Sequence, residues 1–254
     1  SSIALVALDY YNIYIDGHFI GHGPARAARG YIRKDVYDLS DFENFVVTVE
    51  VLCWNIHTFC LATRQPLFGA EIYSGTEKIA DTDDFIAFEV GDCVRKVQKS
   101  SYQRGFSEMY VLSQDRTAFY RGKEVFTPVE TEETPCPKVL DRGVKFPSYE
   151  FCKGQNIQNG QILIDTSAWL WEDVQMMNNY CNDAFDKSEI AEFVSDTVCQ
   201  FIFQKDDKIT NSLTELQYVL YDLEKVVFGQ HVIKLFVEED AELYVTWSQD
   251  VNDA

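Results

Sequence analysis

The stretch YYNIYIDGHFIGHGPARAARGYIRKDVYDL, from Tyr10 to Leu39, decides how the first part of the chain is expected to fold. Its first residues alternate apolar and polar side chains, with the period of a half-buried strand. Asp16–Gly17 follows, and an Asp-Gly pair supplies the positive φ angles of a tight hairpin turn. Four glycines and three arginines are spread over the stretch. We therefore predict a hairpin, a glycine-rich corner and a third strand that carries arginine.

Arginines are notable in this stretch because the chain has a formal net charge of −19. Arg26, Arg29 and Arg33 each offer a rigid fork of hydrogen-bond donors, which suits a sugar or a carboxylate. Aromatic rings near such donors stack on the apolar face of a sugar, and Tyr31 and Trp54 are the rings we assign to that role. On this hypothesis the five residues form a substrate-binding surface.

The alternative hypothesis is structural. The same arginines pair with nearby acids, namely Asp35, Asp38 and Glu50, and fasten the corner to the sheet. We favour this interpretation, because a chain with 41 acidic residues offers many partners and exposed ion pairs are common.

Further strands are expected on both sides of the opening stretch. Before the midpoint, apolar or alternating runs with β-branched residues predict strands at 3–8, 44–54, 68–75, 77–81 and 84–90. Later runs predict strands at 160–165, 217–223, 231–239 and 241–250. Residues 167–180 and 186–203 have mixed periodicity, which leaves helices and long strands both open. This spacing of short strands is typical of antiparallel sandwiches.

A change in composition divides the chain. The segment RGKEVFTPVETEETPCPKVLDRGVKFPS, residues 121–148, holds four of the six prolines and a run of acids, which disfavours a central strand. We predict a mostly β protein with two antiparallel β-sandwich domains of jelly-roll or galactose-binding-like type. The first covers residues 1–120, a connector covers 121–150, and the second covers 151–254, either complete or cut short at its C-terminus.

The overall composition argues against two classes of binding partner. Acidic residues outnumber basic ones by 41 to 22, which argues against binding to nucleic acid and to anionic membranes. No apolar run is long enough to cross a bilayer, and the chain opens on a strand-like run without an initiator methionine or a signal peptide. We expect a piece of a longer protein. The seven scattered cysteines form no CxxC pair, so we expect buried, reduced thiols and a cytoplasmic setting.

Catalytic and metal motifs are weak. A glycosidase needs two carboxyl groups across the scissile bond, but among so many acids a pair carries no information. Nucleophile-elbow, P-loop and HExxH motifs are not found in the sequence. The acids of Asp81–Asp84 would suit Ca²⁺, although the segment lacks the EF-hand pattern. His18 and His22 are not assigned as metal ligands, because the sequence suggests no third ligand near them. We therefore predict no catalytic residue, no metal ligand and no cofactor, with Ca²⁺ left open.

The order of several motifs resembles the N-terminal β-sandwich region of bacterial α-L-rhamnosidases. The matching elements are Asp16–Gly17, Gly23–Arg26, Gly30–Arg33, Asp35–Leu39, Asn44–Trp54, Phe68–Ile72, Thr82–Phe88, Gln103–Tyr110 and Leu140–Phe151. Residues 221–250 resemble the opening of that family's second β-sandwich. Two positions depart from the family pattern: Phe85 stands near a usual tryptophan, and Glu224 replaces a usual glycine.

The resemblance implies a glycoside-hydrolase parent whose catalytic carboxylates lie in a large (α/α)₆ barrel after the β domains. This chain would then be a non-catalytic β-domain fragment that is inactive alone, packs on the barrel and contacts a rhamnose-type sugar. Two alternatives stay open. One is a free-standing carbohydrate-binding module, and the other is a structural module whose arginine corner grips a protein partner.

Overall fold

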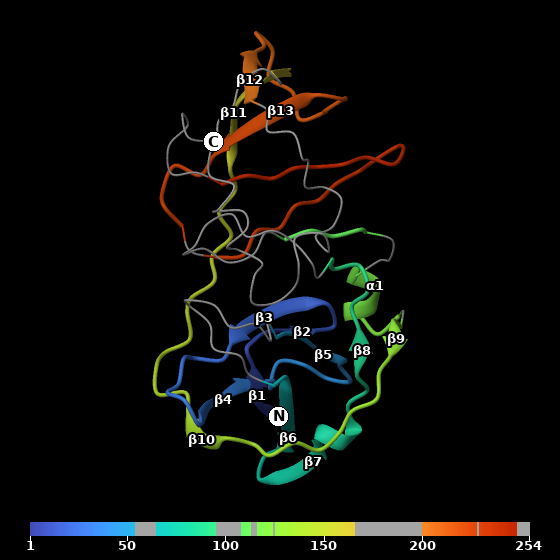
Figure 1. Ribbon diagram of the computed structural model, residues 1–254. Coiled ribbons are helices and arrows are strands. Elements are labelled where there is room, and N and C mark those ends of the chain that lie inside the picture. The colour runs from blue at the N-terminus through green and yellow to red at the C-terminus, as the bar shows by residue number, and fades with distance from the viewer. Residues whose placement is uncertain are drawn as a thin grey trace. The chain divides into compact units, whose positions relative to one another are not determined.

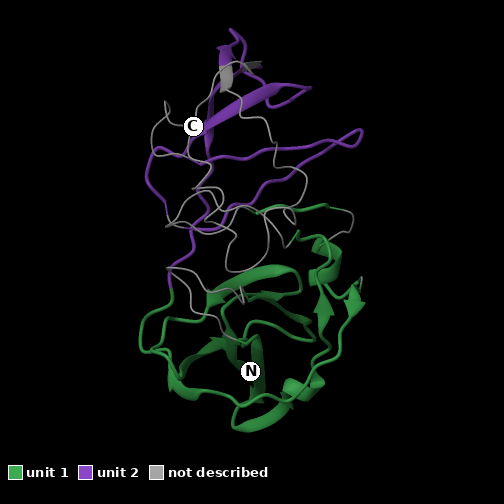
Figure 2. Cartoon of the chain, viewed as in Figure 1, with its two compact units in different colours: residues 1–146, 171–196 green, residues 147–170, 197–254 purple. Residues whose placement is uncertain are grey.

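The computed structural model describes residues 1–53, 65–94, 108–112, 116–123, 125–165, 200–227 and 229–247. Trp54, most of the segment predicted at 103–110, the segment at 167–180 and most of the segment at 186–203 lie outside these residues, and the described end of the last one is a strand. The described chain divides into two compact units (Figure 2). Residues 1–146 belong to the first unit, and residues 147–165 and 200–247 to the second. Strands dominate both units, and the predicted mostly-β sandwich class is confirmed.

The first unit holds most of the strands, as Figure 1 shows. They are β1 (Ser2–Leu8), β2 (Tyr10–Ile15), β3 (His18–Gly23), β4 (Tyr31–Asp38), β5 (Val47–Leu52), β6 (Leu67–Ser74), β7 (Glu77–Asp81), β8 (Phe88–Glu89), β9 (Thr127–Pro128) and β10 (Lys138–Asp141). One sheet has the order β10-β4-β1-β6-β7, a second has the order β3-β2-β5, and β8 pairs with β9. The parallel pair β10–β4 recruits residues of the predicted connector into the first sheet. Two short helices, η1 (Thr82–Asp84) and α1 (Arg116–Tyr120), complete the unit.

The core of this unit lies between the two larger sheets. Alternate residues of β1 and β2 are fully buried, whereas their neighbours are only half-buried. This period of two is what packing one face of each sheet requires. The buried core residues are Ile3, Leu5, Ala7, Tyr11, Ile13, Ile15, Tyr37, Leu39 and Ala70.

The predicted hairpin is present at Asp16–Gly17, between β2 and β3. Asp16 and Gly17 have φ angles of 49° and 79°, as a type I′ turn requires. The carboxylate of Asp16 accepts a hydrogen bond of 2.8 Å from the backbone N–H of Val46, and its own N–H donates to the Val46 carbonyl. The turn is thereby attached to the chain that leads into β5, which pairs with β2.

The second unit contains a three-stranded antiparallel sheet of β11 (Gln155–Asp165), β12 (Gln200–Lys205) and β13 (Gln217–Asp222), in the order β12-β11-β13. The strands predicted at 160–165 and 217–223 are therefore confirmed. The two predicted at 231–239 and 241–250 are wrong over their described residues, where neither strand nor helix is present. Their apolar alternation is real, but a strand also needs a ladder partner, and no described residue supplies one.

Two smaller observations complete the fold. The described cysteines Cys53, Cys93, Cys136 and Cys152 are free thiols, but two are half-buried and two are exposed, so the expectation of burial is wrong for them. None of the helices in the described ranges has the length and apolar character that crossing a bilayer requires.

Candidate functional site

The arginine loop, residues 24–30, joins β3 to β4. Arg26 and Arg29 are exposed, and neither forms a hydrogen bond or an ion pair with a described residue. Tyr31 begins β4 and is 36% exposed. The ammonium of Lys138, on the neighbouring strand β10, lies 5.9 Å from the centre of the Tyr31 ring. Two guanidinium groups and one accessible aromatic ring are thus presented at this corner, while Trp54 lies outside the described residues.

Arg33 has a different environment from the other two arginines. It is half-buried on β4, and its Nη1 donates a 2.8 Å hydrogen bond to the carbonyl of Asp141 in β10. A Cβ added at Gly143 would lie 2.7 Å from the same Nη1, so the guanidinium lies directly against that glycine. Arg33 therefore helps to join β10 to the sheet.

A buried polar cluster, which we call the Asp35 cluster, lies against Gly21 and Gly23 of β3. Its members are Asp35, Tyr11, Tyr37 and Arg142. The Arg142 guanidinium donates a 2.8 Å hydrogen bond to Oδ1 of the fully buried Asp35, and the Tyr11 hydroxyl donates to Oδ2. The hydroxyls of Tyr11 and Tyr37 lie 2.9 Å apart. A buried carboxylate is stable only when its oxygens are bound in this way.

The expected acid partners of the arginine stretch are wrong. Asp35 pairs with Arg142, which lies 107 positions away in the sequence, and Glu50 pairs with Arg116 at 3.3 Å. Asp38 accepts a hydrogen bond from the backbone N–H of Ser40. Arg142 and Arg116 come from segments far along the chain, so the spacing of nearby residues could not predict these two pairs.

Two glycines of the opening stretch, Gly21 and Gly23, leave space for the Asp35 cluster. A Cβ added at Gly23 would lie 2.1 Å from Oδ2 of Asp35 and 2.6 Å from the Tyr11 hydroxyl. One added at Gly21 would lie 2.8 Å from Cε1 of Tyr37. Only the absence of a side chain on β3 leaves room for the cluster. Spacing alone did not indicate this, because it depends on what lies across the sheet.

Electrostatics in the Asp35 cluster and at the neighbouring His22 favour fixed protonation states. Burial, the neighbouring Tyr37 and the bond to Asp35 all raise the pKa of Tyr11 above its usual range. Burial and the nearby Arg142 lower the pKa of His22, whose ring stacks on Tyr10. The Tyr11 hydroxyl and the His22 imidazole are therefore neutral at physiological pH. The contacts of the cluster join β2, β4 and the segment after β10.

A second arginine centre fastens α1 to the sheets. Arg116 binds Asp92 with two bonds of 2.7 Å, from Nε and from Nη2, and a further bond reaches Glu50. Tyr120 of the same helix stacks on Tyr14 of β2, with ring centres 4.1 Å apart. Burial raises the pKa of Tyr14 to about 12. This centre was not predicted from the sequence, because Arg116 lies in no recognisable motif.

The acids of Asp81–Asp84, which were considered for Ca²⁺ binding, form bonds within their own segment. Asp81 accepts from the Asp83 N–H and pairs with Lys78 at 2.7 Å, and Asp84 accepts from the Asp81 N–H. The bonds between these carboxylates and backbone N–H groups belong to a capping box for η1, to which the Lys78 pair is additional. Among the described residues, no group of three or more His, Cys, Asp or Glu side chains is placed to hold a metal ion.

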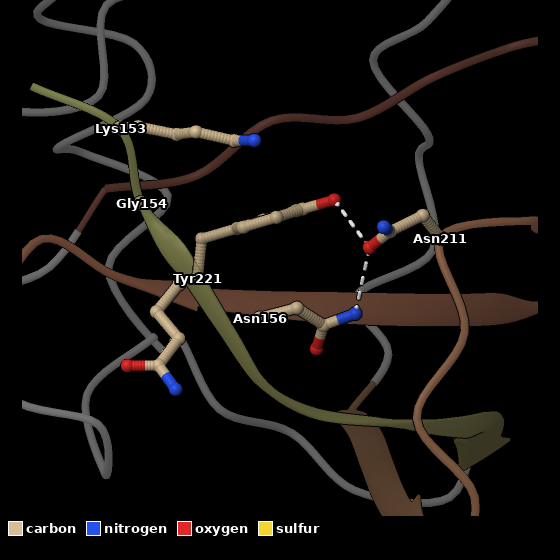
Figure 3. A pocket seen from close by; sticks show the side chains of 6 residues that line it. Lys153, Gly154, Asn156, Asn211 and Tyr221 are labelled. Atoms are coloured by element: carbon tan, nitrogen blue, oxygen red, sulfur yellow. Dashed lines mark hydrogen bonds between the residues drawn. The ribbon is translucent and has the colours of Figure 1, made fainter.

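A polar pocket of about 390 Å³ is present in the second unit (Figure 3). Its lining residues are Lys153, Gly154, Gln155, Asn156, Asn211 and Tyr221. Oδ1 of Asn211 accepts two hydrogen bonds, one of 2.9 Å from Nδ2 of Asn156 and one of 3.0 Å from the hydroxyl of Tyr221. None of the six lining residues has a carboxyl group, and none of them was predicted from the sequence as a binding residue.

No family model and no curated protein matches the chain in sequence. Among solved structures, the fold is similar to a GH78 family rhamnosidase of Bacillus sp. GL1, with a TM-score of 0.51 and 18% sequence identity. The match covers 65% of this chain and 19% of that chain, so the chain spans about a fifth of the rhamnosidase. At this identity the likeness concerns the fold alone.

Proposed function

We propose that this chain is a non-catalytic β-domain module of an α-L-rhamnosidase-like glycoside hydrolase. In this role it packs on a catalytic barrel and contacts a rhamnose-type sugar through Arg26, Arg29 and Tyr31. The observation that supports the proposal most is the fold likeness to a rhamnosidase. The order of the motifs from Asp16–Gly17 to Leu140–Phe151 agrees with it.

The placement of the carboxylates favours a non-catalytic role. A glycosidase places two carboxyl groups on either side of the scissile bond. Asp35 and Asp92 are the buried carboxylates of the described chain, and each is bound by an arginine. An aryl α-L-rhamnoside should therefore stay intact when it is incubated with the purified chain, and saturable release of the aryl group would contradict the proposal.

The sugar contact is assigned to the arginine loop because its side chains are accessible. Arg26 and Arg29 are exposed, and Tyr31 presents part of a ring face to solvent. Guanidinium groups donate paired hydrogen bonds to vicinal hydroxyls, while the ring packs on the C–H face of the sugar. Arg33 is left out of this set, since its Nη1 is bound to the Asp141 carbonyl.

Calorimetric titration with L-rhamnose tests this assignment. We expect the double variant Arg26→Ala/Arg29→Ala to bind at least about tenfold more weakly, the loss expected from removing hydrogen bonds to charged donors. The matched control is Lys225→Ala/Lys234→Ala, which also removes two exposed cations but lies in the second unit. Equal weakening in both variants would indicate a general charge effect and contradict the assignment.

A further inference from the structure

We propose that the polar pocket of the second unit binds one neutral sugar residue through two neighbouring hydroxyl groups. This site is separate from the contact assigned to the arginine loop, and it does not depend on that assignment. It rests on the hydrogen-bond geometry around Asn211 and Tyr221.

The orientation of the Asn211 amide is fixed. Its Oδ1 accepts from both Asn156 and Tyr221, as the dashed lines in Figure 3 show. Two accepted bonds occupy the carbonyl oxygen, so the Nδ2 group of Asn211 is left with its N–H donors. No described residue accepts a hydrogen bond from this nitrogen. Asn211 is exposed, so this oriented donor faces solvent and is available to a hydroxyl oxygen of a ligand.

Tyr221 supplies the complementary group. Its hydroxyl hydrogen is donated to Asn211, so the lone pairs of the same oxygen are available to accept a bond. The donor and the acceptor therefore belong to two side chains that a 3.0 Å hydrogen bond joins, from the Tyr221 hydroxyl to Asn211 Oδ1. Neighbouring hydroxyls on a sugar ring likewise offer one acceptor and one donor on adjacent carbons. Tyr221 is 51% exposed, so its ring adds a face on which the C–H groups of a sugar can pack.

The surrounding chain holds this pair in place. Nδ2 of Asn156 also donates to the Thr210 carbonyl, at 2.8 Å. Three residues along β11, the buried Asn159 donates to the Lys208 carbonyl and accepts from the Thr210 N–H. Two asparagines of one strand therefore pin the loop that carries Asn211. Binding then requires little ordering of the loop, which favours affinity.

Gly154 makes the pocket possible. A Cβ added there would lie 3.0 Å from Cβ of Tyr221 and 3.3 Å from Cδ2 of Leu223. The missing side chain lets Tyr221 lie close to the strand. Lys153 projects beside Tyr221 in Figure 3 and provides a further donor at the rim. Its exposed ammonium is well solvated, so we assign the pocket to a neutral sugar and not to an anion. A volume of about 390 Å³ lies within the ~300–1,000 Å³ typical of small-molecule sites.

The test follows the side-chain amide signals of the ¹⁵N-labelled chain by NMR during titration with L-rhamnose, D-galactose and glycerol. The proposal predicts saturable shifts of the Asn211 signal with at least one sugar at millimolar concentration, and none with glycerol. No saturable shift with either sugar would overturn it, and so would an equal response to glycerol. Arg26→Ala/Arg29→Ala should leave the Asn211 response unchanged, which separates this site from the arginine loop.

The decisive variant is Asn211→Asp. It keeps the oxygen that accepts from Asn156 and Tyr221 but removes the N–H donors, so we expect binding about tenfold weaker, read from the Asn156 side-chain amide because the Asn211 signal is absent in this variant. The control is Gln217→Glu, which makes the same amide-to-carboxylate change in the same unit and keeps the oxygen that accepts from the Thr214 N–H. Tyr221→Phe provides a second variant, which keeps the ring and loses the acceptor. Wild-type affinity in both pocket variants would overturn the proposal.

Discussion

Gly23 shows at the residue scale why the opening stretch is rich in glycine. The space that its Cβ would fill is occupied by Oδ2 of Asp35 and the hydroxyl of Tyr11. We expect Gly23→Ala to lower the free energy of unfolding by about 3 kcal/mol, because the buried cluster must shift to admit a methyl group. Urea unfolding measures this.

The control for that variant is Gly91→Ala, where an added Cβ meets nothing within 4 Å. Its stability should stay within about 0.5 kcal/mol of the wild type. If both alanine variants lost the same stability, the close contact at Gly23 would not be the cause.

His22 is the second residue-scale test, through pH. Burial and Arg142 lower its pKa from the ordinary 6.5, so the native state prefers the neutral ring. Below that ordinary value the unfolded chain binds more protons than the native chain. The stabilisation is therefore complete at higher pH and is lost as the pH falls from about 6.5 towards the lowered pKa.

Unfolding of wild type and His22→Gln should be compared from about pH 8 to about pH 5. The stability difference between them should narrow as the pH falls. His18→Gln, on the exposed end of the same strand, is the control. A wild-type advantage that grows in acid would contradict a lowered pKa for His22.

At the scale of elements, Arg142 attaches the segment after β10 to the sheet through Asp35. Its guanidinium also lies over Phe146, 4.1 Å from the ring centre. We expect Arg142→Ala to cost about 3–5 kcal/mol of unfolding free energy, because the Asp35 charge would be left buried without its partner. Calorimetric melting reports the loss. The double variant Asp35→Asn/Arg142→Met should recover part of it, and a double variant no more stable than Arg142→Ala would contradict this explanation.

The elements also show how far local sequence reasoning reaches. The Asp16–Gly17 turn and the alternation in β2 were predictable, since each depends on neighbours along the chain. The Asp35–Arg142 and Glu50–Arg116 pairs were not, because their members lie 107 and 66 positions apart. Asn211 could not be predicted as a binding residue either. The role proposed for it depends on its bonds to Asn156 and Tyr221, which exist only in the folded loop.

On the scale of the whole molecule, two units carry separate candidate sugar contacts, and neither offers a free pair of buried carboxylates among the described residues. The domain boundaries at residues 120 and 150 stay a prediction. The likeness to a solved rhamnosidase concerns the fold alone, and the role proposed for the chain is sugar contact without hydrolysis.

Saturation-transfer NMR with an aryl α-L-rhamnoside tests this central claim most directly, because one spectrum reports both contact and cleavage. We predict transfer from the protein to the sugar protons while the anomeric signal of the glycoside stays constant. Absence of transfer, or steady conversion of the glycoside to free rhamnose by the chain alone, would contradict the claim.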